Sequence, residues 1–320
     1  MDSSGNPYFV RRAVCPICGS TRSDAICSIP YTSKSMTDYL QAFYGPQGGV
    51  EFAYLDGAQY SLRACQTCAG IYQEFIPNDA LMHRLYEIWI DPTIVQEQHR
   101  NKPADYFAAF SAEIEDVIAW FGGPPAALKF LDFGMGWGQW ALMAKAHGVH
   151  SSGCELSAEQ VQNALSLGLD AIGWDDIPGG CFDFINTEQV FEHIPEPLDT
   201  LRHLKSGLSD RGILKVSVPD AVDIMRRLQV LDWQASLDSR DSLNPVAPLE
   251  HINFFQMESI LAMAQLAGMH AISLPRRTRV PSSPPVPKGA KESAKQLLRP
   301  MYRRLRPAPS TGNYVFLRAD

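Results

Sequence analysis

The chain has 320 residues, of which 45% are hydrophobic and 20% are charged, and it carries a formal net charge of −7. This length suffices for one large α/β domain with a small module, or for two modest domains. No stretch approaches the roughly 18 apolar residues of a bilayer-spanning helix, and the N-terminus lacks the basic start and apolar run of a secretory signal. We therefore expect a cytoplasmic protein whose thiols stay reduced.

Residues 1–90 differ from the rest because they hold five of the seven cysteines and show weak periodicity. We expect a compact N-terminal module here, held by something other than an apolar core. Its two CxxC motifs supply four thiolates, which match tetrahedral zinc with no open position for chemistry. The predicted ligands of this structural zinc are Cys15, Cys18, Cys65 and Cys68. Disulfide or redox use of the same cysteines is the alternative.

Beyond residue 90, apolar runs typical of buried strands alternate with amphipathic segments typical of helices. The expected helices cover residues 103–121, 137–148, 157–168, 197–208 and 257–269. The expected strands cover residues 126–133, 149–155, 170–174, 181–187, 211–219, 270–275 and 313–320. Alternating βα units predict an α/β domain at 91–320, built on a doubly wound, mostly parallel, seven-stranded Rossmann-like sheet.

The turn LDFGMGWG at residues 131–138 joins a predicted strand to a helix. Glycines at such a turn let a ligand approach the backbone, and the helix N-terminus favours an anionic group. Glu155 lies 21 residues after Gly134, at the end of the next strand, where an acid can accept hydrogen bonds from ribose hydroxyls. A dinucleotide fingerprint needs a further glycine where Gln139 stands, which favours S-adenosylmethionine over a nicotinamide cofactor.

Four segments in this order, LDFGMGWG, GCELS, DFINTEQVFEHIPEPL and GILKVSVPD, resemble class I S-adenosylmethionine-dependent methyltransferases. The resemblance covers about residues 103–275 and the last strand. It implies a cofactor site with Asp132, Gly134 and Gly136 at the methionyl part, Glu155 at the ribose, Asp175 or Asp176 at the adenine, and Gln189 and Val190 near the sulfonium.

The cysteine motifs CPICGS and CQTCAGIYQEFIP, placed ahead of such a domain, are similar to those of sugar-nucleotide C-methyltransferases. This resemblance implies a sugar or nucleotide-sugar acceptor. Those enzymes carry a further C-terminal domain, whereas this chain ends with the methyltransferase sheet. Methylation at carbon and methylation at oxygen are therefore both open.

Methyl transfer from a sulfonium to a hydroxyl or an acidic C–H needs a base that removes the acceptor proton. The C-methylating sugar enzymes have a Glu-His pair before an aromatic residue, and EHINFF at residues 250–255 matches it. We expect His251 to be the base and Glu250 to orient it or act as a second acid. His193, in FEHIP, is a further catalytic candidate, although a histidine there can also be structural.

The partners follow from the charge distribution. Residues 276–306 hold ten basic side chains and one acid, so this segment carries +9 and the rest of the chain −16. An acidic body argues against nucleic acid as a partner. The segment, part of an excursion at 276–310, is expected to be a solvated loop, to meet an anionic substrate, or to contact the inner face of the membrane.

Three other functions stay open at the level of the sequence. The first is an O-methyltransferase that acts on a small metabolite or a lipid-linked glycan. The second is a non-catalytic cofactor-binding or scaffold protein with a degenerate domain, against which the intact Gly134, Gly136 and Glu155 count. The third is a nicotinamide oxidoreductase. The oligomeric state is not predicted.

Overall fold

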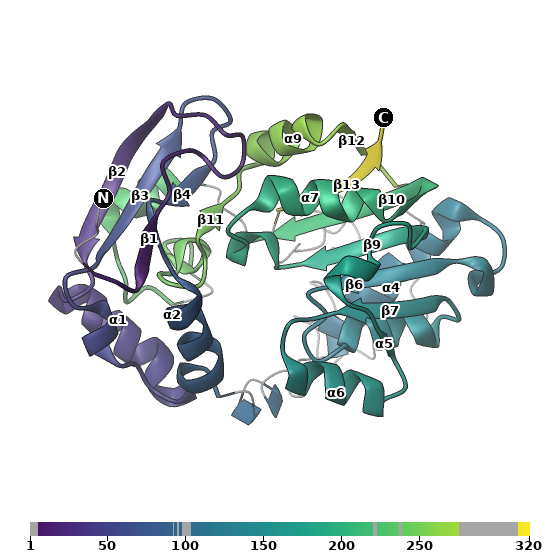
Figure 1. Cartoon of the computed structure of the whole chain (residues 1–320), viewed down its shortest axis with the longest axis horizontal. Coiled ribbons are helices and arrows are strands. Elements are labelled where there is room, and N and C mark those ends of the chain that lie inside the picture. Colours follow the sequence, from purple (N-terminus) through teal and green to yellow (C-terminus); the bar gives the residue numbers. More distant parts are fainter. Residues whose placement is uncertain are drawn as a thin grey trace, which may run out of the picture.

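The computed structural model describes residues 6–91, 93–94, 96–97, 104–219, 223–236, 239–274 and 313–320. The basic segment at 276–306 lies outside them. Within the described residues, three sheets of two, four and seven strands are present. Figure 1 shows the smaller sheets beside the large one, with the early part of the chain on one side and the βα units on the other.

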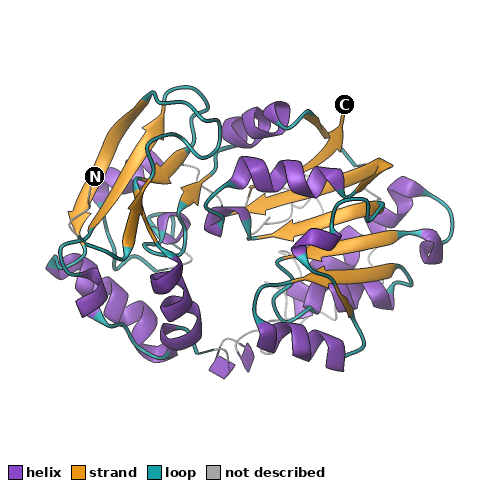
Figure 2. Cartoon of the chain, viewed as in Figure 1, coloured by secondary structure: helices purple, strands orange, loops and turns teal. Residues whose placement is uncertain are grey.

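The seven-stranded sheet confirms the predicted fold class. Its strands, in spatial order, are β12 (Met269–Ile272), β13 (Asn313–Ala319), β10 (Leu208–Val218), β9 (Phe182–Glu188), β6 (Lys129–Phe133), β7 (His150–Cys154) and β8 (Asp170–Ala171). β13 runs antiparallel to both of its neighbours, β10 and β12, and every other pair in the sheet is parallel. Figure 2 shows the carboxyl ends of β9 and β10 pointing toward the N-terminal part of the chain.

Each helix expected around this sheet is present. They are α4 (Ala104–Phe121), α5 (Gln139–Ala146), α6 (Ala158–Ser166), α7 (Pro197–Ser206) and α9 (Met257–Leu266). Successive side chains of a strand point to opposite faces, so Phe130 packs with α4 and α5, while Leu131 packs with α7 and α9. Because both faces are covered, the central strands β6, β9 and β10 are buried over most of their length.

The N-terminal module is built from short strands and helices. Its strands are β1 (Phe9–Arg11), β2 (Ser23–Pro30), β3 (Gln59–Cys65), β4 (Ile71–Gln73) and β5 (Phe75–Pro77). Its helices are α1 (Lys34–Tyr44), α2 (Asp79–Arg84) and the π-helix η3 (Leu85–Trp89). The expectation of a module without an apolar core is wrong, because Tyr31, Met36, Leu40, Tyr60 and Trp89 are fully buried together. Their irregular spacing hid this core from a periodicity analysis.

Part of the later chain returns to this module. Residues 224–254 contain α8 (Ile224–Val230) and β11 (Asn253–Phe254), neither of which was expected. β11 pairs with β4 and so becomes the edge of the four-stranded sheet. The hydroxyl of Tyr60 donates to the carbonyl of Val246 at 2.6 Å. The domain division at residue 90 stays a prediction, but the described residues of 224–236 and 239–254 include side chains that pack with the module, among them Ile224, Trp233 and Phe254.

The remaining elements are single turns of 3₁₀-helix. They are η1 (Gly45–Gln47), η2 (Phe52–Leu55), η4 (Pro125–Ala127), η5 (Trp174–Asp176), η6 (Phe191–His193) and η7 (Asn244–Val246). No helix among the described residues is long and apolar enough to cross a bilayer.

Candidate functional site

The glycine turn between β6 and α5 has an exposed backbone. Gly134 and Gly136 adopt φ angles of 71° and 52°, a left-handed region that a side chain disfavours. A Cβ on Gly134 would lie 2.6 Å from a methyl carbon of Val190. The bare backbone therefore lets the end of β6 approach the segment after β9. The structure thus brings together two regions that the sequence assigns to the cofactor.

Glu155, which directly follows β7, is hydrogen-bonded to the same turn. Its Oε2 accepts from the backbone N–H of Gly136 at 3.0 Å. Its Oε1 accepts from the N–H groups of Leu156, at 2.7 Å, and Ser157, at 3.2 Å. The carboxylate thus ties the glycine turn to the start of α6. Beside it, the Leu156 side chain is 97% exposed, which leaves an apolar surface next to this acid.

Asp132 lies beneath the turn and is only 3% exposed. Its Oδ1 accepts a hydrogen bond of 2.8 Å from the Asn186 amide on β9. Burial raises the pKa of Asp132 to about 7, although the bond from Asn186 opposes this change. In this position the side chain braces β6 against β9.

The two acids after β8 have different environments. Both Asp175 and Asp176 are exposed on η5. Asp176 Oδ2 accepts from the Gly173 N–H at 2.9 Å and so caps its own turn. Asp175 is therefore the more available of the two for a ligand. Next to them, Trp174 stacks on His203 with a ring separation of 3.8 Å.

Gln189 and Val190 follow β9, and a buried charge cluster that the sequence analysis missed lies below them. Gln189 has a φ of 56°, and its Nε2 donates to the Ser217 hydroxyl at 3.3 Å. Lys215, 3% exposed, binds Glu113 at 2.8 Å and Glu188 at 2.5 Å. Burial alone would lower the pKa of Lys215, but the two carboxylates outweigh it and raise this pKa. A lysine within the apolar run GILKVSV was the signal for this cluster.

The structure brings the two candidate histidines together. The rings of His193 and His251 lie 4.9 Å apart, nearly edge to face. His251 Nδ1 lies 2.7 Å from the carbonyl of Asn244, and His193 Nδ1 lies 3.0 Å from the carbonyl of Glu250. A carbonyl only accepts hydrogen bonds, so each Nδ1 is the donor and each Nε2 keeps its lone pair. Burial lowers the pKa of His251 to about 4 and, with His251 as neighbour, that of His193 to about 3.

Glu250 does not contact the His251 ring in the way expected of an orienting residue. Its Oε1 accepts from the Tyr44 hydroxyl at 2.6 Å, and the group that orients His251 is the Asn244 carbonyl. Burial raises the pKa of Glu250. The catalytic roles of Glu250, His193 and His251 stay predictions.

Two further residues beside the histidines were not anticipated. Neither carboxylate oxygen of Glu192 has a hydrogen-bond partner among the described residues, and Oε1 lies 3.8 Å from His193 Nε2. Burial raises the pKa of Glu192 to about 8. The Tyr86 hydroxyl lies 3.2 Å from His193 Nδ1. Glu192 stands next to a candidate in the sequence, but Tyr86 reaches the site only through the tertiary fold.

The four predicted zinc ligands form one cluster. Sγ atoms of Cys15 and Cys68 lie 3.7 Å apart, and those of Cys18 and Cys65 lie 3.5 Å apart. Sulfurs about 2.3 Å from a tetrahedral zinc ion would lie about 3.8 Å from one another. All four sulfurs lie within 4.8 Å of each other, so the residues fit zinc. Its buried cysteines belong to the same hydrophobic cluster as Leu131 of β6 and Ile260 of α9.

Comparison with known proteins agrees with this architecture. A family model described as a methyltransferase domain matches residues 95–274. No curated protein matches the chain. Several solved structures do, all at low identity.

One such structure is an S-adenosylmethionine-dependent methyltransferase from Thermotoga maritima, a possible histamine N-methyltransferase. It is 16% identical, covers 71% of this chain and 95% of its own, and has a TM-score of 0.40. The plantazolicin methyltransferase BpumL, solved with S-adenosylhomocysteine, is 17% identical over 74% of this chain and 93% of its own, with a TM-score of 0.47. A methyltransferase from Archaeoglobus fulgidus is 12% identical, covers 70% of this chain and 97% of its own, and has a TM-score of 0.41.

The family match spans more than half of the chain and covers the glycine turn, the acid after β7 and both histidines. It decides against the oxidoreductase alternative. The chain therefore belongs to the methyltransferase-domain family and is an S-adenosylmethionine-dependent methyltransferase.

Proposed function

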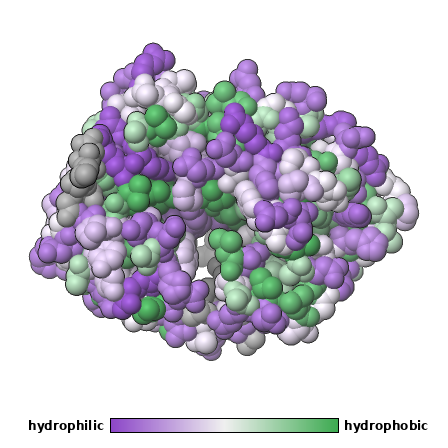
Figure 3. All heavy atoms as spheres, in the orientation of Figure 1, coloured by the Kyte–Doolittle hydropathy of each residue, from purple (hydrophilic) through white to green (hydrophobic). Residues whose placement is uncertain are grey.

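We propose that the enzyme transfers the methyl group of S-adenosylmethionine to a sugar or nucleotide-sugar acceptor that binds beside His193 and His251. The observation that carries this proposal is the histidine pair itself. Two neutral imidazoles with free Nε2 lone pairs lie at the carboxyl ends of the strands, where ligands of parallel sheets bind. Figure 3 shows the surface hollowed between the N-terminal module and the sheet domain, with apolar side chains at its edge.

The residues assigned to the cofactor fit their proposed roles. The backbone of Gly134 and Gly136 would meet the methionyl part above the buried Asp132, and Asp175 would meet the adenine in preference to Asp176. Gln189 and Val190 would lie near the sulfonium. A carboxylate offers about four lone-pair sites, and backbone N–H groups use three of those on Glu155. The fourth lone-pair site is available to a ribose hydroxyl. Of the three sites in use, the one that accepts from Ser157 at 3.2 Å has the weakest hydrogen bond.

Replacing Glu155 with glutamine is expected to weaken cofactor binding by about 1–3 kcal/mol, because it removes charge-assisted hydrogen bonds. Calorimetric titration with S-adenosylhomocysteine measures this directly. Glu159→Gln is the matched control, since this acid is exposed in the first turn of α6. Equal affinity of the Glu155 variant and the control would exclude the ribose assignment.

The proposed mechanism is a direct displacement. Bound S-adenosylmethionine would supply an electrophilic methyl group and, after the sulfur–methyl bond breaks, would leave as S-adenosylhomocysteine. His251 Nε2 accepts the proton of the acceptor hydroxyl or C–H as the new bond to the methyl carbon forms. The Asn244 carbonyl keeps the ring in the tautomer that leaves this atom free. Glu192 and His193 complete the polar wall around the acceptor.

The lowered histidine pKa gives a distinctive pH dependence. A base must be neutral, and the His251 pKa of about 4 keeps it neutral well below the ordinary histidine value of about 6.5. We expect His251 to stay neutral between pH 7 and about 5, so the part of the kcat/KM profile that this ring controls should fall only as the pH drops through about 4. A His251 imidazole NMR signal that titrates near pH 6.5 would contradict the buried environment of this ring.

The acceptor is found by offering nucleotide sugars to the full-length enzyme with an isotopically labelled methyl donor. Incorporation into a nucleotide sugar supports the proposal, and the labelled atom separates C- from O-methylation. Label only in a small metabolite or a lipid-linked glycan would favour the O-methyltransferase. A scaffold would bind no cofactor at millimolar concentration. We also propose that the four cysteines bind zinc and that the protein is cytoplasmic. Residues 276–306 are proposed to contact an anionic surface.

A further inference from the structure

The two segments that carry the histidines are held together by one buried amide. Asn253 is fully buried on β11. Its Nδ2 donates to the carbonyls of Phe191, at 3.1 Å, and Ile194, at 2.6 Å. The N–H of Ile252 donates to the Glu192 carbonyl at 2.8 Å. The turn that contains one histidine is therefore fixed to the strand that follows the other.

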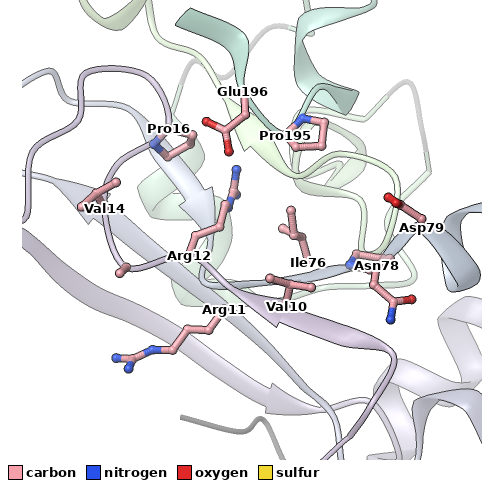
Figure 4. A pocket seen from close by; sticks show the side chains of 12 residues that line it. Val10, Arg11, Arg12, Val14, Pro16, Ile76, Asn78, Asp79, Pro195 and Glu196 are labelled. Carbon is pink, nitrogen blue, oxygen red and sulfur yellow. The ribbon is translucent and has the colours of Figure 1, made fainter. Parts of the chain in front are cut away.

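A buried arginine connects this joint to the N-terminal module. Arg12 Nη1 donates to Asn253 Oδ1 at 2.7 Å, and Nη2 donates to the Ile252 carbonyl at 2.6 Å. The Gln73 carbonyl accepts from both Nε and Nη2 of the same guanidinium, at 2.9 and 2.7 Å. Figure 4 shows Arg12 at the edge of a cavity of about 440 Å³, with its guanidinium directed toward Glu196.

The module ends of these contacts lie next to the cysteine motifs. Arg12 is three residues before Cys15, and Gln73 is five residues after Cys68. The Gln73 amide also donates to the His251 carbonyl at 2.8 Å. The four cysteines therefore lie close in sequence to Arg12 and Gln73, the two residues of the module that hold the histidine segments.

Burying a guanidinium costs desolvation free energy. Arg12 is only 9% exposed, and replacing buried ionic groups with apolar ones often leaves stability unchanged or higher. What the planar, multi-donor group adds is direction, because it fixes several acceptors in one geometry. Its acceptors are backbone and amide oxygens that lead to the histidines. This points to a role in placing the histidine segments.

We infer that Arg12 and Asn253 are positioning residues that make the cysteine module part of the acceptor site. They hold His193 and His251 at the distance and tautomer that acceptor chemistry needs. The inference rests on the proposed function, because it assigns the histidines to the acceptor. It predicts that breaking this connection harms methyl transfer and leaves the cofactor half of the site intact.

The test uses full-length Asn253→Ala and Arg12→Gln, with Arg11→Ala as control because Arg11 forms a more exposed pair with Glu74. Imidazole ¹⁵N NMR, with signals assigned through His193→Asn and His251→Asn, reports the tautomer of both rings. We expect the Nδ1–H form in the wild type and the control, and a mixture of tautomers in both variants. With the acceptor from the labelling screen, kcat should fall about 10–100-fold. Affinity for S-adenosylhomocysteine should stay within about twofold.

Arg12→Lys, which keeps the charge with fewer fixed donors, should recover part of the lost kcat. Arg12→Lys also replaces Asn253→Ala in the test if the latter variant does not fold. Unchanged ring spectra in a folded variant would overturn the inference, even if methyl transfer itself is confirmed. A parallel loss of S-adenosylhomocysteine affinity and kcat would also overturn it, because it would indicate general destabilisation.

Discussion

Replacing His251 with asparagine is expected to lower kcat about 10²–10⁴-fold, the usual contribution of a positioned general base. Affinity for S-adenosylhomocysteine should not change, because the ring contacts Asn244 and His193 rather than the glycine turn. Asparagine keeps a polar side chain of smaller size at the site, so the loss would report missing proton transfer. Single-turnover rates with the labelled donor, compared at saturating acceptor, measure the chemical step.

His270→Asn is a suitable control for this experiment. His270 is exposed on β12, the edge strand of the large sheet, and pairs with Asp320. Glu250→Gln separates the remaining roles, because it keeps an acceptor for the Tyr44 hydroxyl while it removes the charge. If the His251 variant retains a third or more of the wild-type rate, another group takes the proton. Glu192, whose carboxylate lies 3.8 Å from His193 Nε2, would then be the next candidate to replace.

The sequence predicts which of the residues assigned to the cofactor lie together, because these residues are local. Gly134 and Gly136 belong to one strand-turn-helix unit, and Glu155 directly follows the next strand, β7, so adjacent parallel strands must bring them together. The sheet itself follows from the same alternation. Only the antiparallel β13 depends on a segment distant in sequence, and its apolar run was still recognisable.

The acceptor half depends on contacts that no local pattern contains. Tyr86 meets His193, and Tyr44 meets Glu250, across 107 and 206 residues of chain. β11 is two residues long and exists because β4 offers an edge to it. The sequence motifs indicated both histidines as candidates, but not the groups that fix their tautomers. For the same reason Glu250 was expected to orient His251, whereas its carboxylate contacts Tyr44.

Removing one of the four proposed zinc ligands is expected to have the largest effect on stability. Cys15→Ser should abolish zinc binding and lower the free energy of unfolding by more than about 4 kcal/mol, because loss of a structural metal is among the most damaging single changes. Cys15 is fully buried in the cluster that includes Ile260 of α9, so the damage would extend into the methyltransferase core. Metal content by mass spectrometry and thermal unfolding measure the two effects.

Cys181→Ser provides the matched control, since this thiol is exposed and lies outside the cluster. The module also has an apolar core around Tyr31 and Leu40, so it should keep part of its secondary structure without the metal. Without the metal, the two cysteine motifs should separate before the apolar core unfolds. Arg12 and Gln73, which lie next to these motifs in sequence, should then lose their relative positions. A wild-type melting temperature for Cys15→Ser, or a purified chain without zinc, would show that apolar packing alone holds the module.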